Sequence, residues 1–262
     1  MNASPRVSYA SIPSRDAYHG AVVFFWQVRT LAERKGFRAT FMPKPFVSLT
    51  GSGAHCHTSL HDVSTGVNVC GGGGKEVHGL GPVALKFLGG VLANAPAMAA
   101  LTNPTVNSYK RLNATGTTSG ATWSPNAVTW AGNNRTALVR VPSGAPRFEI
   151  RLADISVNPY LLPAAIIAGG LDGLKEKVPP APPPCDLNMF STSDPAVAEA
   201  RAKAPKLPQN LSSALDKFES CSAAREVLGD GFIGSYVKLR RAHWEEYCAA
   251  LSRWELEQYL DS

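Results

Sequence analysis

Residues 147–152 read Arg-Phe-Glu-Ile-Arg-Leu, and this stretch decides the fold class. Side chains alternate between faces along a strand, so Arg147, Glu149 and Arg151 would share one face. The apolar residues between them would share the opposite face and pack against a core. We therefore predict an α+β fold, in which a curved and mainly antiparallel sheet is backed by helices.

A second strand is predicted directly after the glycine-rich turn at residues 51–53. His55, His57 and Ser59 fall on one face of this strand by the same alternation. A third strand, over 137–141, would pair with the first stretch around a proline-rich and glycine-containing turn. The polar faces of these strands would then line a cleft.

The polar face of 147–152 favours the binding of an anion. Two arginines on one strand face can grip a phosphate or a carboxylate, and Glu149 between them could hold a bridging divalent metal. Arg135 and Arg140 add two cations just upstream, which suggests a highly anionic ligand. A strip of surface salt bridges is the alternative interpretation. For the two histidines, both an ordinary structural role and a ligand role remain open.

The rest of the chain is expected to be mostly helices and long ordered loops. Helices are predicted over 22–35, 83–101, 158–174, 208–220 and 231–254, with a further strand over 38–46. Loops are predicted over 66–81 and 103–134, and a stiff polyproline connector over 178–184. The last helix carries one apolar stripe, for which core packing is the simplest explanation: Ile233, Tyr236, Val237, Trp244, Tyr247, Leu251 and Trp254.

The composition of the chain argues against several classes of protein. The chain has 262 residues, 44% of them hydrophobic, and a net charge of +6 without runs of basic residues, which argues against nucleic acid as the partner. No window approaches about 18 consecutive apolar residues, so we expect no membrane span. The five cysteines are scattered and are expected to be reduced thiols. We expect a cytoplasmic protein, with an organelle as the alternative because residues 1–15 contain arginines and serines but no acid.

Several other features carry no chemistry in this interpretation. The glycines at 71–74 before Lys75 lack the spacing of a phosphate loop, and Glu76 replaces its Ser or Thr. Cys56 is predicted to point away from the neighbouring histidines. His61 and His78 are predicted to face solvent.

Ordered sequence blocks resemble those of the glutamine synthetases from about Ala21 to the end of the chain. The blocks are residues 39–46, 51–60, 103–112, 134–136, 147–151 and 158–161. Residues 119–125 are most similar to the bacterial-type branch called type III, which includes glutamate–amine ligases. The resemblance implies part of the family's catalytic barrel and an ATP-dependent ligation, in which the γ-carboxylate of glutamate is phosphorylated and an amine displaces the phosphate.

The resemblance also implies roles for individual residues. His55 and Glu149 would bind Mg²⁺ or Mn²⁺. The nucleotide would be bound by His57, Ser59, Arg135, Arg140 and Arg147. Gly51, Arg111 and Arg151 would bind glutamate, and Arg111 and Arg135 would also act in catalysis.

The sequence departs from the family pattern in three places. Thr50 replaces an asparagine, residues 113–133 contain no carboxylate, and few carboxylates precede Glu149. The missing loop carboxylate leaves room for methylamine or larger amines in place of ammonia. Because hard cations want about six oxygen-rich ligands, a complete metal site is not expected here.

We therefore expect residues 1–20 to be a divergent leader and 21–262 to be the C-terminal portion of the catalytic domain. The family's N-terminal β-grasp domain and upstream metal ligands are expected to be missing, so the chain would bind nucleotide weakly and turn over little. With that N-terminal part present, a homo-oligomer is expected. A non-catalytic relative that binds nucleotide or modulates a complete synthetase is the alternative function.

Overall fold

The protein was analysed as a computed structural model that describes residues 14–72, 76–114, 116–118, 122–144, 146–191 and 193–260. The chain divides into two compact units, residues 1–41 and 42–262. The first unit contains helix α1 (Ser14–Arg34). The ring of Phe41, in the segment after the helix, contacts that of Phe25 edge-on, with the ring centroids 4.6 Å apart. The helix thus begins earlier than predicted, within the expected leader, of which residues 1–13 lie outside the described part.

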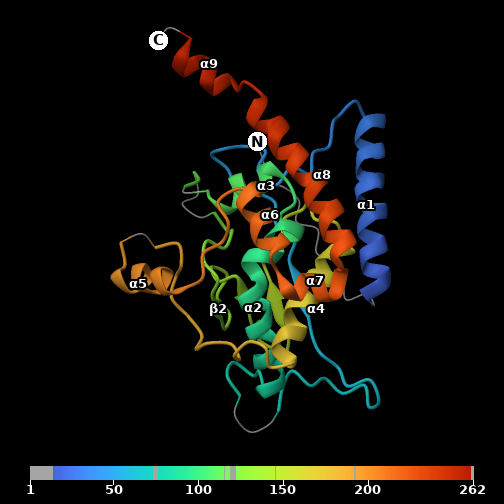
Figure 1. The fold of residues 1–262 in the computed structure, drawn as a ribbon, viewed down its shortest axis with the longest axis vertical. Helices are drawn as coiled ribbons and strands as arrows, with labels where there is room; N and C mark the ends of the chain where they lie inside the picture. Colours follow the sequence, from blue (N-terminus) through green and yellow to red (C-terminus); the bar gives the residue numbers. More distant parts are fainter. Residues whose placement is uncertain are drawn as a thin grey trace. The chain divides into compact units, whose positions relative to one another are not determined.

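The second unit contains the sheet and the remaining helices (Figure 1). The described strands are β1 (Cys56–Thr58), β2 (Trp130–Ala131), β3 (Val139–Arg140) and β4 (Phe148–Ile150). The helices are α2 (Pro82–Thr102), α3 (Val106–Leu112), α4 (Leu161–Leu174), α5 (Pro195–Lys203), α6 (Leu211–Glu219), α7 (Ser222–Leu228), α8 (Asp230–Ala249) and α9 (Arg253–Tyr259).

The strands form one sheet in the order β1-β4-β3-β2. β4 pairs antiparallel with both β1 and β3, whereas β2 and β3 are parallel. The prediction of a mixed fold with a mainly antiparallel sheet is thereby confirmed. Glu149 lies opposite His57 on β1 and opposite Arg140 on β3, so the central strand joins the two polar segments.

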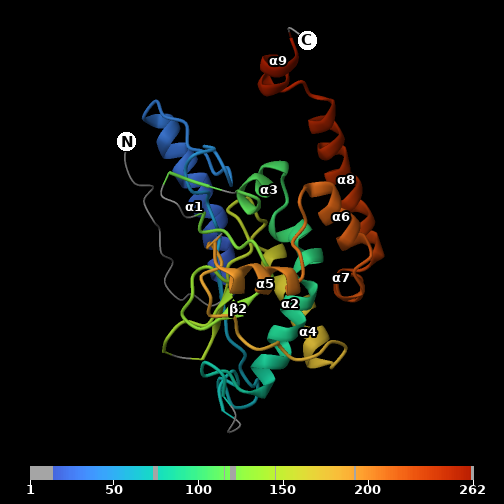
Figure 2. The ribbon, with the colours of Figure 1, turned by 90° about the vertical axis from the view of Figure 1, so that its left-hand side faces the viewer.

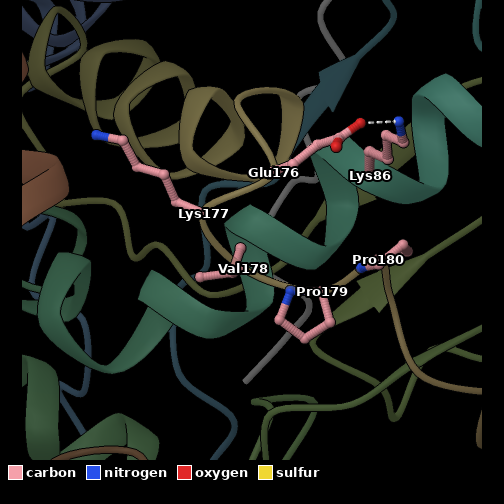
Figure 3. Close-up of a pocket in the computed structure, with 7 residues that line it drawn as sticks. Lys86, Glu176, Lys177, Val178, Pro179 and Pro180 are labelled. Atoms are coloured by element: carbon pink, nitrogen blue, oxygen red, sulfur yellow. Dashed lines mark hydrogen bonds and ion pairs between the residues drawn. The ribbon is translucent and has the colours of Figure 1, made fainter.

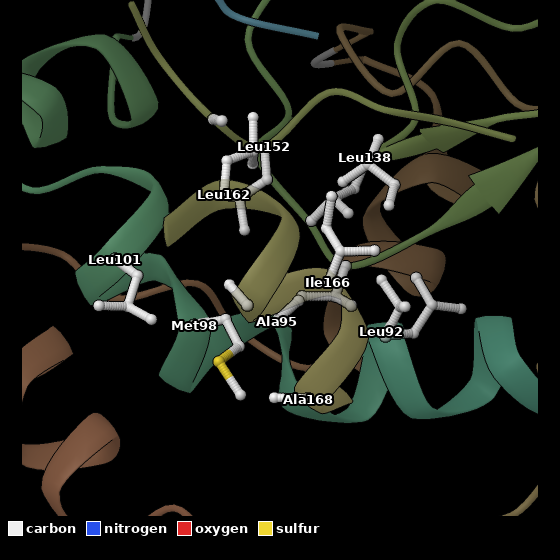
Figure 4. Packing of buried hydrophobic residues seen from close by; sticks show 14 of the residues in the cluster. Leu92, Ala95, Met98, Leu101, Leu138, Leu152, Leu162, Ile166 and Ala168 are labelled. Carbon is white, nitrogen blue, oxygen red and sulfur yellow. The ribbon is translucent and has the colours of Figure 1, made fainter. Parts of the chain in front are cut away.

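The core forms between the sheet and helices α2 and α4 (Figure 4). Phe148 and Ile150 of β4 are buried, as their alternation with the charged residues predicts. Leu92 of α2 lies beside Ile166 of α4 in this core, and Met98 of α2 lies near Ala168 of α4 (Figure 4). α6 packs on α2, and α8 packs in turn on α6 (Figures 1 and 2).

Helix α2 is long and apolar enough to cross a membrane when length and composition alone are considered. However, 67% of its most apolar stretch is buried inside the protein. It contacts α4 and α6 along its length, which is typical of a central core helix.

Glycines set the close approach of α2 and α4. A Cβ atom on Gly90 would lie 2.2 Å from the carbonyl oxygen of Gly169 and 2.5 Å from the amide nitrogen of Gly173. These are backbone atoms, so the helices themselves would have to separate. We expect Gly90→Ala to cost about 1–3 kcal/mol of unfolding free energy, measured by urea denaturation.

Gly234 on α8 offers the matched control for this substitution. A Cβ atom there would meet nothing within 4 Å. Since glycine in a helix costs about 0.5–1 kcal/mol relative to alanine, Gly234→Ala should stabilise the protein. Equal effects of the two substitutions would contradict this account of the α2–α4 contact.

Several predicted elements are wrong. Residues 38–46, all described, contain no strand: the backbone N–H of Lys44 donates to Asn107 Oδ1 (2.7 Å), and its carbonyl accepts from Asn107 Nδ2 (3.0 Å). The predicted loop 103–134 contains α3, whose first turn is closed by reciprocal hydrogen bonds between Thr105 and Ser108. α5, α7 and α9 were also not predicted.

The apolar stripe of the last predicted helix is only half core. Ile233, Tyr236 and Val237 are buried, whereas Tyr247 and Trp254 are exposed. The reason is that the fully buried residues of α8 all lie near its N-terminal end, and α9 has no buried residue. The prediction of core packing is therefore wrong for the end of the stripe, at Tyr247, Leu251 and Trp254, whereas Trp244 is partly buried against the core.

Candidate active site

Glu149 is the centre of a charged cluster on the polar face of the sheet. Its Oε1 atom lies 2.8 Å from His55 Nδ1 and 3.3 Å from Arg151 Nη1, and its Oε2 accepts a hydrogen bond from Arg140 Nε. The residue is only 4% exposed. Burial alone would raise the pKa of this carboxyl, but the hydrogen bonds from His55 and Arg140 outweigh it and hold the pKa well below its usual range. Glu149 is therefore ionised at neutral pH.

His55 is the neutral partner in this cluster. Burial lowers its pKa, although the hydrogen bond to Glu149 acts in the opposite direction. A neutral ring that donates its Nδ1–H to Glu149 keeps the lone pair of Nε2 for a ligand. This arrangement is typical of a metal-binding histidine that is oriented by a carboxylate.

Arg111 approaches the cluster from α3 and is 2% exposed. Its Nη1 donates to the carbonyl oxygen of Leu152 (3.0 Å), and its Nη2 to that of Arg151 (3.4 Å). The glycine turn closes on this side chain: a Cβ on Gly53 would lie 2.8 Å from Arg111 Nη2, and one on Gly51 would lie 2.9 Å from Arg111 Cγ. Glycine at both positions lets the backbone pass directly beside the guanidinium.

Asp154 compensates the charge of Arg111. Burial lowers the pKa of Arg111 to about 10, and the charge of Asp154 opposes this shift. Asp154 is fully buried, and its Oδ1 accepts hydrogen bonds from the amide nitrogen (2.8 Å) and hydroxyl (2.5 Å) of Ser156. The sequence analysis did not single out Asp154. An acid flanked by Leu152, Ala153 and Ile155 is the signal that could have found it.

A more exposed layer surrounds this buried one. Arg147 Nε donates to His57 Nδ1 (3.4 Å), and Ser59 Oγ lies 3.1 Å from His61 Nε2. Arg135 is exposed and has no hydrogen bond or ion pair within the described ranges. Arg140 contacts both the buried Glu149, through its Nε, and the exposed Asn133, whose Oδ1 accepts a hydrogen bond from Arg140 Nη1 (2.6 Å). The sequence analysis did not name Asn133.

The two layers differ in what they can do. We define the inner layer as Arg111, Glu149 and Arg151, which are all at most 4% exposed. We define the outer layer as His57, Ser59, Arg135 and Arg147, whose side chains reach the surface. The inner layer is fixed by its own contacts, whereas the outer layer can meet phosphate groups from solvent.

The described residues do not by themselves form a metal site. His55 Nε2 and Glu149 would supply two ligands, but both carboxylate oxygens of Glu149 are engaged by His55, Arg140 and Arg151. Within the described part of the chain, no group of three potential ligands comes together. Mg²⁺ or Mn²⁺ needs a more oxygen-rich set than these residues offer.

The remaining histidines and cysteine are placed as follows. His61 is exposed, as predicted, and Cys56 packs against the core on the opposite face from the cluster. His78 is not simply solvent-facing: its Nε2 lies 3.2 Å from Asp186 Oδ2, and its ring meets Trp130 edge-on at 5.9 Å. His78 is thus exposed, as predicted, but the loop that carries it also brings its ring against Trp130 of β2.

A pocket lies away from this cluster (Figure 3). It has a volume of about 460 Å³ and is lined by Lys86, Gly173, Glu176, Lys177, Val178, Pro179 and Pro180. Both of its lysines already have carboxylate partners, Lys86 with Glu176 and Lys177 with Glu226. No member of the charged cluster lines it.

The cluster therefore defines a class of protein. Arginines gather around one ionised carboxylate and one neutral histidine on a rigid sheet. Such a site neutralises a polyanion without reorganisation, which is the arrangement that phosphoryl-transfer enzymes use.

Comparison with known proteins identifies the family. Residues 16–259 match the model of the glutamine synthetase catalytic domain. The chain therefore belongs to the glutamine synthetase family, as its sequence blocks predicted.

Individual relatives support this assignment. The chain is 49% identical over 239 residues to a glutamine synthetase of Rhizobium leguminosarum bv. phaseoli, which covers 91% of the chain and 53% of the relative. It is 39% identical over 233 residues to a glutamate–methylamine ligase of Methyloversatilis universalis, covering 88% and 51%. The chain thus spans about half the length of these relatives.

Solved structures agree with the sequence relatives. GmaS in complex with ADP superimposes with a TM-score of 0.84 at 43% identity, over 96% of this chain and 56% of that one. GmaS without ligand gives 0.81 at 40% identity, over 95% and 54%.

Proposed function

We propose that this protein carries part of the active site of an ATP-dependent ligase that joins ammonia or a small amine to the γ-carboxylate of glutamate. The observation that carries the proposal is the two-layered arginine cluster around Glu149. Its exposed layer suits the phosphates of ATP, and its buried arginines suit the carboxylates of glutamate. The family relationship supplies the reaction class.

In this proposal, each residue has one task. His57, Ser59, Arg135, Arg140 and Arg147 bind the nucleotide phosphates. Gly51, Arg111 and Arg151 bind glutamate, while Arg111 and Arg135 also stabilise the charge of the transferring phosphoryl group. His55 and Glu149 contribute to a site for Mg²⁺ or Mn²⁺, a Lewis acid that would neutralise phosphate charge in the complete site.

The proposed reaction takes the γ-glutamyl phosphate route that the family relationship implies. A γ-carboxylate oxygen attacks the γ-phosphorus of ATP, and the bond to ADP breaks. The amine nitrogen then attacks the carbonyl carbon of the phosphorylated carboxyl group, inorganic phosphate leaves with the bonding electron pair, and the amine gives up one proton. Positioned arginines lower the barrier of the first step by matching the charge spread over the phosphoryl oxygens.

The larger assembly is also part of the proposal. β1 and β2 are the edge strands of the described sheet, which suits a sheet that continues into a wider barrel. Exposed apolar residues gather between the end of α8 and the residue after α9, which suits association with other copies in a cytoplasmic homo-oligomer: Tyr247, Leu251, Trp254, Leu256, Tyr259 and Leu260.

The test is a product assay with the purified chain. The chain is incubated with ATP, Mg²⁺ or Mn²⁺, glutamate, and ammonia or methylamine, and ADP and γ-glutamyl amide are measured by mass spectrometry. We expect slow ADP formation that requires glutamate, with aspartate as the matched inactive acid. ADP formation that ignores glutamate, or no amide product, would contradict the proposal.

A non-catalytic role is the second candidate, favoured by the lack of a three-ligand metal group among the described residues. In this case the chain binds nucleotide without forming amide. Co-expression with a full-length relative would then give mixed oligomers with altered ligase activity.

A further inference from the structure

Trp123 adopts an unusual backbone conformation beside the inner layer. Its φ angle is +54°, in the left-handed region that bulky residues rarely adopt. Strained residues of this kind persist where surrounding contacts hold them, and they cluster at functional sites. Here the contact is with the site itself, because the carbonyl oxygen of Trp123 accepts a hydrogen bond from Arg151 Nη2 (3.4 Å).

Two buried polar atoms next to this contact lack partners. Ser124 is 1% exposed, and its hydroxyl makes no hydrogen bond to any described residue. Arg151 Nε is likewise buried and unbonded within the described ranges. A buried polar atom without a hydrogen bond is destabilising, so a ligand that supplies the partner is favoured.

An aromatic pair adjoins these atoms. The Trp123 ring is in edge-to-face contact with Phe190 at 6.1 Å, and Trp123 is 45% exposed. The segment before Phe190 is tied to the neighbours of Arg135: Asn134 Nδ2 donates to Leu187 O (2.8 Å), and Met189 N donates to Thr136 Oγ1 (2.9 Å). The pair therefore lies between the segments that carry Arg135 and Arg151.

We propose that Trp123, Ser124 and Phe190 form the subsite for the amine nucleophile, and that this subsite selects an alkylamine over ammonia. The inference rests on the proposed ligase function and deepens it. Aromatic faces attract an alkylammonium ion and cover its carbon atoms. Ammonium has four N–H donors and no apolar surface, and residues 113–133 offer it no carboxylate.

The chemistry of the subsite balances without a further reactant. The alkylammonium ion binds against the aromatic pair and loses one proton to solvent base. Ser124 Oγ accepts a hydrogen bond from the neutral amine and so fixes its orientation. The C–N bond forms, the C–O bond to phosphate breaks, and the second nitrogen proton passes to the departing phosphate.

The first test measures binding and does not depend on turnover. The chain is labelled with 5-fluorotryptophan, and the Trp123 resonance, one of five, is assigned by its loss in Trp123→Phe. Methylammonium chloride should shift this resonance in a saturable way, and ammonium chloride at equal ionic strength should bind about 5-fold or more weakly. Ser124→Ala should weaken methylammonium binding, and Trp254→Ala, the matched control, should leave it unchanged. A Trp123 resonance that ignores methylammonium, or responds equally to both ions, would overturn the proposal.

The second test separates this inference from the ligase function. Trp123→Gly relieves the backbone strain but removes the ring, so the ratio of kcat/KM for methylamine to that for ammonia should fall about 5-fold or more, while the KM for ATP stays constant. Trp123→Phe should retain the preference. If the methylamine-to-ammonia ratio of kcat/KM is unchanged in Trp123→Gly, the amine subsite is contradicted, but the ligase function is not. If the unaltered chain forms no amide product, the ligase function is contradicted. The 5-fluorotryptophan binding test then still shows whether the subsite binds methylammonium.

Discussion

Replacing Glu149 with glutamine should both destabilise the protein and abolish its ligase activity. The side chains of Arg140 and Arg151 are 11% and 3% exposed, and both are bonded to this carboxylate. Without its charge they are left buried and uncompensated, which typically costs about 3–5 kcal/mol. Urea denaturation should report this loss. Glutamate-dependent ADP formation should fall at least about 100-fold, because His55, Arg140 and Arg151 all lose their common anchor.

Glu199→Gln provides the matched control for this experiment. Glu199 also pairs with a cation, Lys203 at 2.6 Å, but both side chains are exposed. Exposed pairs contribute little, so unfolding and activity should both stay at the level of the unaltered protein. If Glu149→Gln behaves like Glu199→Gln, then Glu149 is not the centre of the cluster.

Replacing Arg135 with glutamine should abolish activity without affecting stability. Arg135 is exposed, and it bonds to no described residue, so its removal breaks nothing in the fold. If it stabilises the transferring phosphoryl group, as proposed, its loss should lower kcat by about 10²–10³-fold. The measurement pairs steady-state ADP formation with the urea midpoint.

The control for Arg135 is another exposed arginine. Arg253→Gln on α9 removes the same charge from a side chain that is 92% exposed and pairs with Glu257. It should change neither turnover nor the urea midpoint. A drop in the urea midpoint of Arg135→Gln would mean that the residue is structural, and unchanged turnover would remove it from the phosphoryl site.

The strands of the site were predictable because alternation is a local property. The charged and apolar residues of 147–152 alternate strictly, and in 55–59 His55, His57 and Ser59 alternate with Cys56 and Thr58. The buried face of each strand can therefore be predicted from that strand alone. Once β1 and β4 pair, the polar faces of His57 and Glu149 must meet on the same side of the sheet.

The predictions that were wrong depend on contacts between distant segments. Asn107 binds the backbone of Lys44 across 63 positions, which keeps residues 38–46 out of a sheet. The short helix α3 is specified by Thr105 and Ser108, whose reciprocal hydrogen bonds are easily overlooked in a polar stretch. The apolar stripe of α8 does not reveal where the core beneath it ends.

The arginines of the inner layer could be predicted from the sequence, but the groups that hold them in place could not. Arg111 and Arg151 stand out in the sequence, but Asp154 and the Trp123 carbonyl do not. These supports act through backbone positions and buried charge, which leave no periodic pattern. The +54° φ angle of Trp123 has no signature in a residue type that normally avoids it.

The burial of Glu149 with Arg140 and Arg151 has a consequence for how this protein can evolve. A well-packed apolar trio at these positions would often be as stable as the ions or more stable. Selection for thermal stability alone would therefore tend to erase the charges, and only selection for ligand chemistry would retain them. Homologues that have lost the ligase activity should therefore carry apolar residues at the positions of Arg140, Glu149 and Arg151, while the rest of the sheet is unchanged.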